Sequence, residues 1–304
     1  MNEAQHRKLR VLWATDGSDA SRGAIFILRD TVLPAAESLT VLTVAPQSFM
    51  IGARPDKAFL TRARPAEKER ALVDAEQEAQ RETLLLDPPK IEVQAVARWG
   101  NPIEETLRAA RAYRSDLIVL GAKGHSDLGL MLLGSVSQGV VQHSTIPILV
   151  ARPHTAAFDN ILVGFDGSRP AQKGMQFLDR LTLPKDALVR LTYAFEPYQL
   201  PVGLSGAQKK AATADAERLD EHRMSMAERT LRAAADLAAR PNRRVEIEVV
   251  AGPIALGLQE AARRHGAGLI VVGSRRPSAA RDYLVGSTAE RLVRHASASV
   301  LVVR

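Results

Sequence analysis

The sequence predicts an α/β protein built from two tandem domains, each a doubly wound five-stranded parallel sheet. Residues 11–18 end an apolar run with Asp-Gly-Ser, and residues 161–168 repeat this pattern 150 positions later. In both halves, short runs rich in β-branched residues alternate with helical patterns, which favours parallel strands joined by right-handed crossovers. A self-similarity that spans nearly half the chain indicates a duplicated domain rather than a short-period solenoid.

The length of the chain agrees with two domains. Its 304 residues divide into halves of about 150, and each half is large enough to bury its own core. Residues 146–152 and 298–304 also match, and the segment 152–158 has the character of a short linker. We therefore expect one domain at residues 1–152 and a second at 158–304.

Each element of this fold can be placed on the chain in order, with strands on short apolar runs and helices on the amphipathic patterns between them. In the first half we expect strands at 11–14, 39–44, 91–97, 117–120 and 148–150, and helices at 19–31, 65–86, 102–113 and 135–143. In the second half we expect strands at 161–163, 187–194, 245–250, 269–272 and 300–303, and a long polar helix at about 207–239. Ligands of such sheets bind at the carboxyl ends of the strands, where the winding reverses.

A glycine-rich loop follows the fourth expected strand of the first half. It reads Gly121-Ala-Lys-Gly124, then nine residues, then Gly134-Ser135, where a helix is expected to begin. Glycine permits close backbone approach, and the start of a helix offers unpaired N–H donors and a favourable dipole end to an anion. This pattern is typical of a phosphate-binding loop.

The second half carries a degenerate copy of the loop. It reads Gly273-Ser-Arg-Arg276, then nine residues, then Gly286-Ser287-Thr288. Arg276 stands where the first half has Gly124, and a residue with a Cβ cannot follow the same backbone path without strain. Its guanidinium can instead bind a phosphate, plug the pocket or pair with Asp166. We therefore expect nucleotide binding mainly in the first half.

The Asp-Gly-Ser turn after the first strand is the other candidate part of the site. Asp16 can accept hydrogen bonds from a ribose hydroxyl or, through water, meet a phosphate-bound Mg²⁺. The alternative is a turn or N-cap aspartate. Backbone groups of Ala14, Thr15 and Val44 at the strand ends can frame an adenine, and packing alone is equally compatible with the sequence. Phe165 replaces Thr15 in the second half.

Composition and missing motifs argue against several other functions. The chain has no cysteine, which removes disulfides, thiol chemistry and thiolate metal sites. No apolar run approaches the roughly 20 residues of a membrane span, and the first ten residues lack a secretory core, so we expect a cytoplasmic protein. The net charge of +7 is spread along the chain, which favours a solvated basic surface over nucleic-acid binding. Walker, dinucleotide and hydrolase-elbow motifs are absent.

These motifs together closely resemble those of the universal stress protein family in its tandem-domain form. The resemblance covers almost the whole chain and implies an adenine nucleotide alpha hydrolase-like fold that binds ATP, with or without Mg²⁺. It also implies that the domains pair through their last strands, 146–150 and 299–303. The nucleotide-binding residues that it implies in the first half are Ala14, Thr15, Asp16, Val44, Leu120, Gly121, Gly124, Gly134, Ser135 and Val136. Their counterparts in the second half are Asp166, Gly273, Gly286, Ser287 and Thr288.

We therefore expect a stress-response protein that binds adenine nucleotide and acts as a regulator rather than an enzyme. No general base or arginine finger stands out, so hydrolysis is expected to be slow at most. The two domains are expected to form an intramolecular pseudo-dimer, and further homodimerisation stays open. Two alternatives also stay open: an interaction scaffold or small-ligand sensor with vestigial pockets, and nucleic-acid binding through the basic surface.

Overall fold

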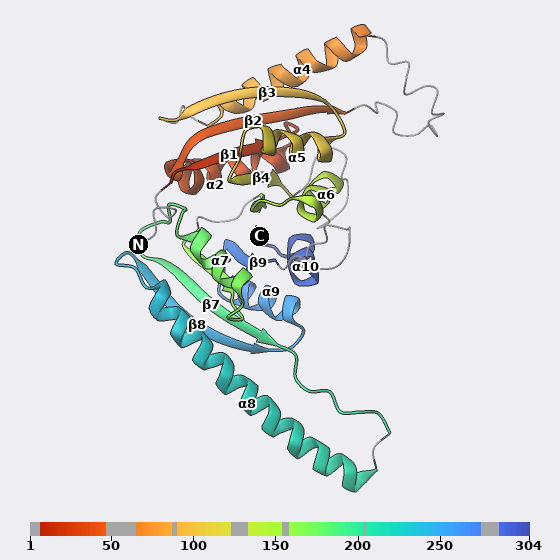
Figure 1. Ribbon diagram of the computed structural model, residues 1–304, viewed down its shortest axis with the longest axis vertical. Helices are drawn as coiled ribbons and strands as arrows, with labels where there is room; N and C mark the ends of the chain where they lie inside the picture. Colours follow the sequence, from red (N-terminus) through yellow and green to blue (C-terminus); the bar gives the residue numbers. More distant parts are fainter. Residues whose placement is uncertain are drawn as a thin grey trace.

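The two halves of the chain form one continuous ten-stranded sheet with helices on both faces (Figure 1). The computed structural model describes residues 7–46, 65–86, 90–122, 133–153, 158–203, 205–274 and 286–304. The strands of the sheet lie in the order β3-β2-β1-β4-β5-β10-β9-β6-β7-β8. Within each half every strand pair is parallel, so the predicted pair of doubly wound five-stranded sheets is confirmed.

The strands lie where the apolar runs predict them, with ends that differ by a few residues. In the first half they are β1 Leu9–Ala14, β2 Ala36–Pro46, β3 Glu92–Gly100, β4 Leu117–Gly121 and β5 Ile148–Ala151. In the second half they are β6 Asn160–Gly164, β7 Ala187–Phe195, β8 Arg243–Ala251, β9 Leu269–Gly273 and β10 Ser299–Val303.

The helices follow the predicted alternation with the strands. In the first half they are α1 Asp19–Arg22, α2 Ala24–Ile27, α4 Pro65–Leu84, α5 Pro102–Ala112 and α6 Ser135–His143. In the second half they are α7 Arg169–Leu178, α8 Gly206–Ala238, α9 Ile254–Arg264 and α10 Ser287–His295.

The helix expected at 19–31 is present, but it is not one regular α-helix. The segment breaks into α1 and α2, followed by a π-helical turn, Leu28–Val32, and a 3₁₀ turn, Leu33–Ala35. Gly23 lies between α1 and α2 in the αR conformation, and its N–H donates to the carbonyl oxygen of Asp19 at 3.1 Å. Pro34 within the last turn lacks an N–H donor. The expected linker at 152–158 lies partly outside the described residues, and the domain boundary stays a prediction.

The last strands of the two halves join the sheet, as expected from the family resemblance. β5 and β10 run antiparallel, with Leu149 opposite Leu301 and Val150 opposite Val300. Because equivalent residues in this region lie 152 positions apart, the register maps onto itself when the halves are exchanged. The junction between β5 and β10, the seam between the two halves, therefore has the symmetry of an isologous dimer interface within one chain.

Two arginines at equivalent positions fasten the seam from both sides. Arg152, after β5, donates from Nη2 to the carbonyl oxygens of Val293 (2.7 Å) and Arg294 (3.2 Å) near the end of α10. Arg304, after β10, donates to the carbonyl oxygen of Val141 near the end of α6. Cations at helix C-termini are favoured by the helix dipole, so each half caps a helix of the other.

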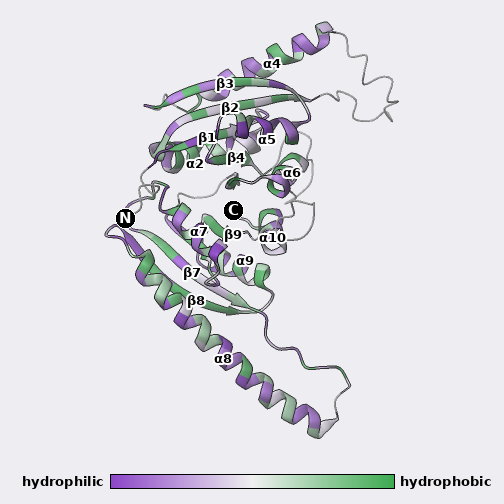
Figure 2. Cartoon of the chain, viewed as in Figure 1, coloured by the Kyte–Doolittle hydropathy of each residue, from purple (hydrophilic) through white to green (hydrophobic). Residues whose placement is uncertain are grey.

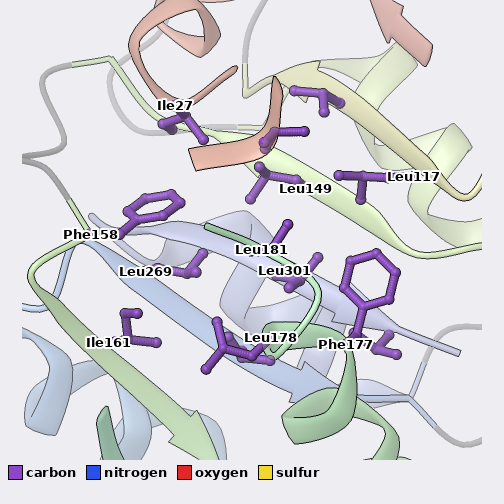
Figure 3. Close-up of a cluster of buried hydrophobic side chains, with 14 of the residues drawn as sticks. Ile27, Leu117, Leu149, Phe158, Ile161, Phe177, Leu178, Leu181, Leu269 and Leu301 are labelled. Carbon is purple, nitrogen blue, oxygen red and sulfur yellow. The ribbon is translucent and has the colours of Figure 1, made fainter. Parts of the chain in front are cut away.

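The apolar core forms two layers, one on each face of the sheet, and both layers cross the seam. Residues of α2, α4, α7 and α8 pack on one face, and residues of α5, α6, α9 and α10 pack on the other. Figure 3 shows part of the first layer, with Leu149 and Leu301 near Leu117 and Phe177. The two halves therefore share their core as well as their sheet.

Helix α8 extends well beyond the sheet (Figure 1). It has 33 residues against 20 in α4, and its buried residues, from Ala227 to Ala238, lie only in its last part. Its polar and apolar residues alternate along its length in Figure 2. A preceding segment is tied to it, because the N–H of Tyr198 donates to Asp220 at 3.2 Å. None of the helices in the described ranges has the length and hydropathy of a membrane span.

Gly273 is required by packing. A Cβ at this position would lie 2.1 Å from the carbonyl atoms of Pro170 and 2.5 Å from the nitrogen of Ala171, in the first turn of α7. We expect Gly273→Ala to lower the free energy of unfolding by about 1–3 kcal/mol, because the backbone itself must move. Gly206→Ala is the control, since a Cβ there meets nothing within 4 Å. Equal denaturant midpoints for both variants would contradict this packing role.

Candidate functional site

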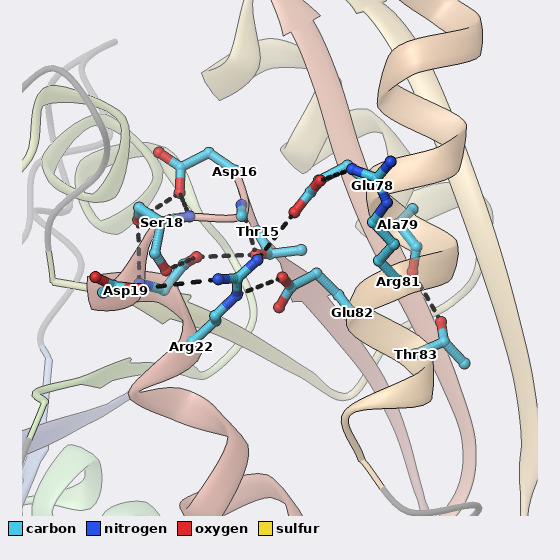
Figure 4. A network of polar contacts seen from close by, with 12 residues as sticks. Thr15, Asp16, Ser18, Asp19, Arg22, Glu78, Ala79, Arg81, Glu82 and Thr83 are labelled. Carbon is cyan, nitrogen blue, oxygen red and sulfur yellow. Dashed lines mark hydrogen bonds and ion pairs between the residues drawn. The ribbon is translucent and has the colours of Figure 1, made fainter.

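The Asp-Gly-Ser turn of the first half is built by local hydrogen bonds (Figure 4). Asp16 Oδ1 accepts from the N–H of Ser18 at 3.1 Å and from its hydroxyl at 2.6 Å. Ser18 Oγ in turn accepts from the N–H of Ser21 and caps α1. Gly17 has φ +73°, which favours glycine. Asp16 thus has the turn role considered above, and its side chain is also exposed.

The second half repeats the turn. Asp166 Oδ1 accepts from the N–H of Ser168 at 2.9 Å, and Ser168 Oγ accepts from the N–H of Ala171 at 3.4 Å. Gly167 has φ +77°. The two turns therefore present equivalent carboxylates at the carboxyl ends of β1 and β6.

The strand ends of the first half bring four of the predicted residues together. Ala14 at the end of β1 pairs in register with Leu120 of β4, and Gly121 ends that strand. Val44 lies on β2, two residues beyond the partner of Ala14. The side chain of Thr15 is buried within the turn, where Oγ1 accepts from the N–H of Gly17 at 3.1 Å. Its hydroxyl therefore serves the turn.

Two hydrogen bonds hold the start of α6 against the end of β4. Ser137 Oγ donates to the carbonyl oxygen of Gly121 at 2.6 Å, and the N–H of Gly134 donates to the carbonyl oxygen of Ala122 at 2.8 Å. Gly134 is the N-cap, and no side chain caps this helix start. Ser135 and Val136 form its first two positions. Gly124 of the predicted loop lies outside the described residues.

The second half builds the equivalent corner with a serine. The N–H of Gly286, the N-cap of α10, donates to Ser274 Oγ at 3.4 Å, and Arg304 donates to the same oxygen at 3.3 Å. No side chain caps α10 either. Arg276 lies outside the described residues, so its three alternative roles stay predictions.

A cavity of about 330 Å³ opens between these elements in the second half. It brings together all five residues predicted there: Asp166, Gly273, Gly286, Ser287 and Thr288. Apolar side chains, including Ile254, Leu258 and Val272, form another part of its wall. This volume lies in the range of small-molecule sites, which combine apolar walls with a few directed polar groups.

Sequence comparison gives the same duplication as the structure. The sequence profile of the universal stress protein family matches residues 9–152 and again residues 157–304. The chain belongs to the universal stress protein family. The predicted family and its tandem form are thus confirmed.

Individual relatives agree with this assignment. A universal stress protein of Thermus aquaticus is 34% identical over 145 residues, which cover 47% of this chain and 97% of the relative. The crystal structure of a universal stress protein from Archaeoglobus fulgidus has a TM-score of 0.66 at 19% identity and covers 97% of this chain and 98% of its own. A functionally unknown protein from Pseudomonas aeruginosa has a TM-score of 0.59 at 16% identity, covering 99% and 94%. At these identities, the structural likeness shows the fold alone.

Some residues around the cavity of this universal stress protein were missed from the sequence. Thr192 is fully buried, and its Oγ1 has no hydrogen-bond partner among the described residues. Ala194 lies 150 positions after Val44, so the repeat itself could have located it. Ile254 and Leu258 project from α9, and only the tertiary fold brings this helix to the cavity.

The two universal stress protein domains differ in two side chains near their Asp-Gly-Ser turns. Phe165, where the first half has Thr15, is 5% exposed and lines the cavity. In the first half, Glu82 of α4 is fully buried and accepts a hydrogen bond from Arg22 Nε at 2.8 Å. Burial raises the pKa of the Glu82 carboxyl above its usual value, and the bond from Arg22 offsets part of the rise. Within the described ranges, no three acidic or histidine side chains gather as a metal site.

The raised pKa of Glu82 predicts a pH-dependent stability. The folded protein binds the proton of the Glu82 carboxyl more tightly than the unfolded chain does. The stability that this protonation contributes is therefore fully present below the ordinary glutamate pKa, and it is lost as the pH rises through the raised pKa of Glu82. We expect the stability difference between the wild type and Glu82→Ala to shift in favour of the variant over that window. Urea unfolding at a series of acidic to neutral pH values measures this stability difference. Glu104→Ala, at an exposed glutamate, is the control. Parallel pH profiles for wild type and Glu82→Ala would contradict the assignment.

Proposed function

We propose that this universal stress protein binds an adenine nucleotide at the carboxyl ends of the strands, and that it acts as a regulator rather than an enzyme. The sequence favours binding mainly in the first half, and the cavity of the second half leads us to extend the proposal to that half as well. The observation that carries the proposal is the cavity of the second half, in which Asp166 and the uncapped start of α10 line one space. In the first half, Asp16 follows β1 and the uncapped start of α6 follows β4, at the equivalent positions of the repeat.

The helix starts supply the phosphate end of the proposed site. Helices α1, α5 and α7 are capped by the side chains of Ser18, Asn101 and Ser168, whereas α6 and α10 begin after Gly134 and Gly286. The first N–H groups of a helix have no intrahelical partner, and the dipole favours negative charge there. Glycine at these N-caps leaves the donors open to a phosphate.

The other end of the cavity suits a nucleoside. Asp166 can accept hydrogen bonds from ribose hydroxyls, while Ile254, Leu258 and Val272 offer apolar contact to a base. The hydroxyl of Thr192 has no hydrogen-bond partner in the part of the chain that the structure describes, and this supports a polar ligand next to the apolar walls, because a buried polar group without a partner costs free energy. These residues fit an adenine nucleotide better than a purely apolar ligand.

The bound nucleotide would supply charge and order rather than a covalent reaction. Its phosphates, with or without Mg²⁺, would lie against the helix starts, and Asp16 or Asp166 could reach such a cation through water. Occupancy would therefore act by fixing the turns and helix starts around each site and so changing the surface that the protein presents.

Mass spectrometry of small molecules released from the purified protein tests the ligand, followed by calorimetry with ATP and Mg²⁺. We expect measurable binding, with Asp16→Asn and Asp166→Asn each weakening the site of its own half. Asparagine keeps the oxygen that accepts from Ser18 or Ser168 and removes the charge. Gly124→Arg, which copies the second half, tests the first-half loop. Absence of any nucleotide binding would overturn the proposal.

A second function, as an interaction scaffold, is favoured by one observation. The part of the chain that projects from the sheet exposes large apolar side chains, and these are Tyr198, Val202, Leu219, Met224 and Met226. Flexible methionine-rich surfaces adapt to partners. If Gly124→Arg and the two aspartate variants all left nucleotide retention unchanged, the scaffold would become the better reading.

A further inference from the structure

Arg22 joins the Asp-Gly-Ser turn of the first half to helix α4 through several carboxylates (Figure 4). Its guanidinium lies 2.8 Å from Glu82 Oε1 and 3.4 Å from Glu78 Oε1, both on α4, and 3.8 Å from Asp19 Oδ1. Arg22 ends α1, the short helix that Ser18 caps. One side chain therefore links the Asp-Gly-Ser turn to a helix about 60 residues away in the sequence.

Glu78 also lies against the turn itself. A Cβ added at Gly17 would lie 2.1 Å from Glu78 Oε1, so the carboxylate is in contact with the middle of the turn. Gly17 stands between Asp16 and Ser18, whose hydrogen bonds orient the carboxylate proposed to meet the ribose. A displacement of α4 would therefore move Glu78 and change its contact with the Asp-Gly-Ser turn.

The second half has the same scaffold without these charges. The side chain nearest to a Cβ at Gly167 is Thr230, at 3.0 Å, and Thr230 and Ala234 stand 152 positions after Glu78 and Glu82. Gln172 stands 150 positions after Arg22, and it donates to the carbonyl oxygen of Gly167 at 3.0 Å. A neutral set of contacts therefore builds the same turn, so the fold does not require the charged set.

The charged set also carries an energetic cost. Glu82 is fully buried, and its Oε2 has no hydrogen-bond partner among the described residues. Buried ion pairs often contribute little net stability, because desolvation opposes the attraction between the charges. The second half folds without an equivalent of the Arg22–Glu82 ion pair. We therefore look for the role of this pair in the residues that it holds in place, rather than in net stability.

We propose that Arg22, Glu78 and Glu82 are positioning residues for the nucleotide site of the first half. They couple occupancy of that site to the packing of α4 against the sheet. This inference rests on the proposed nucleotide binding. Nucleotide at Asp16 stabilises the turn, the turn holds Arg22, and Arg22 holds α4. By linkage, a firmly seated α4 strengthens nucleotide binding to the same degree. The outer face of α4 thereby becomes a surface that responds to occupancy in one half only.

Hydrogen exchange of full-length protein with and without ATP and Mg²⁺ tests the coupling. We expect added nucleotide to slow exchange in α4, residues 65–84, in an Asp166→Asn background that weakens the second site. The triple variant Arg22→Gln, Glu78→Thr and Glu82→Ala, which carries the residues of the second half, should lose this protection. Its affinity for ATP should fall about tenfold.

Matched variants separate positioning from general stability. Arg232→Gln removes an arginine from the exposed Glu228–Arg232 pair on α8 and should leave both readouts unchanged. Arg22→Lys keeps the charge and should restore most of the protection of α4. If the triple variant fails to fold, Glu78→Gln alone, which keeps the size of the side chain and removes its charge, should show the same loss of protection.

The outcomes distinguish the two proposals. If calorimetry shows no ATP binding, the proposed function is overturned and this inference falls with it. If ATP binds but exchange in α4 is unchanged, or if the folded triple variant or Glu78→Gln behaves like the wild type, only the coupling is overturned.

Discussion

Replacing Leu301 by alanine is expected to lower the free energy of unfolding by about 2–5 kcal/mol. Leu301 is fully buried, lies on β10 at the centre of the seam, and stands opposite Leu149 of β5. Truncation removes apolar contact and leaves a cavity where the cores of both halves meet. Because the sheet continues through this point, we expect both halves to lose stability together.

A double-mutant cycle with Leu149→Ala sharpens this prediction. The two leucines are register partners in one buried cluster, so the combined effect is expected to differ from the sum of the single effects by about 0.5–3 kcal/mol. Denaturant unfolding followed by circular dichroism measures all four proteins. Leu237→Ala, at a leucine that is 70% exposed, should change little. If Leu301→Ala lowered the free energy of unfolding no more than Leu237→Ala does, packing at the seam would not contribute to stability.

Gly286→Ala is expected to leave folding intact and to weaken nucleotide binding in the second half by about 10- to 100-fold. A Cβ at Gly286 meets nothing within 4 Å among the residues that the structure describes, and the φ of −55° at this position is one that alanine adopts readily. A methyl group at the N-cap of α10 would hold a phosphate away from the first N–H groups. The loss of one charge-assisted hydrogen bond, about 1.5–3 kcal/mol, corresponds to this change in affinity.

The measurement uses calorimetry in an Asp16→Asn background, in which the weakened first site contributes less to the measured binding. Gly206→Ala, at the equally open start of α8, is the matched control and should bind as the wild type does. Unchanged affinity in Gly286→Ala would place the phosphates elsewhere in the cavity. Together with Gly273→Ala, this variant separates a glycine that serves a ligand from one that serves packing.

The sequence predicts those parts of the fold that depend on local patterns. Helix α6, for example, has the predicted bounds of 135–143, because a glycine N-cap and an apolar face define it locally. The break at Gly23 was missed, since the apolar pattern of 19–31 continues through it. Candidate site residues on turns and helix starts could be proposed from the sequence, because their spacing repeats in both halves, and their role in binding stays a prediction.

Residues that reach the site through tertiary packing could not be named from the sequence. Ile254 and Leu258 form cavity walls only because α9 packs across the strand ends. Glu82 lies in a helix rich in charge, where the pattern predicts a solvated face. Its burial depends on Arg22 being placed against it, and a separation of 60 residues gives no local signal for that pairing.

The symmetric register of β5 and β10 has a consequence for how the two halves could change during evolution. In a dimer of identical chains, every substitution appears on both sides of the axis and must serve both. Within one chain, the partners meet at a fixed and high effective concentration, so pairing survives even when the copies differ. One copy can then carry Arg22 and Glu82 while the other carries Gln172 and Ala234. Fusion thus allows the two candidate sites to change separately while they share one sheet.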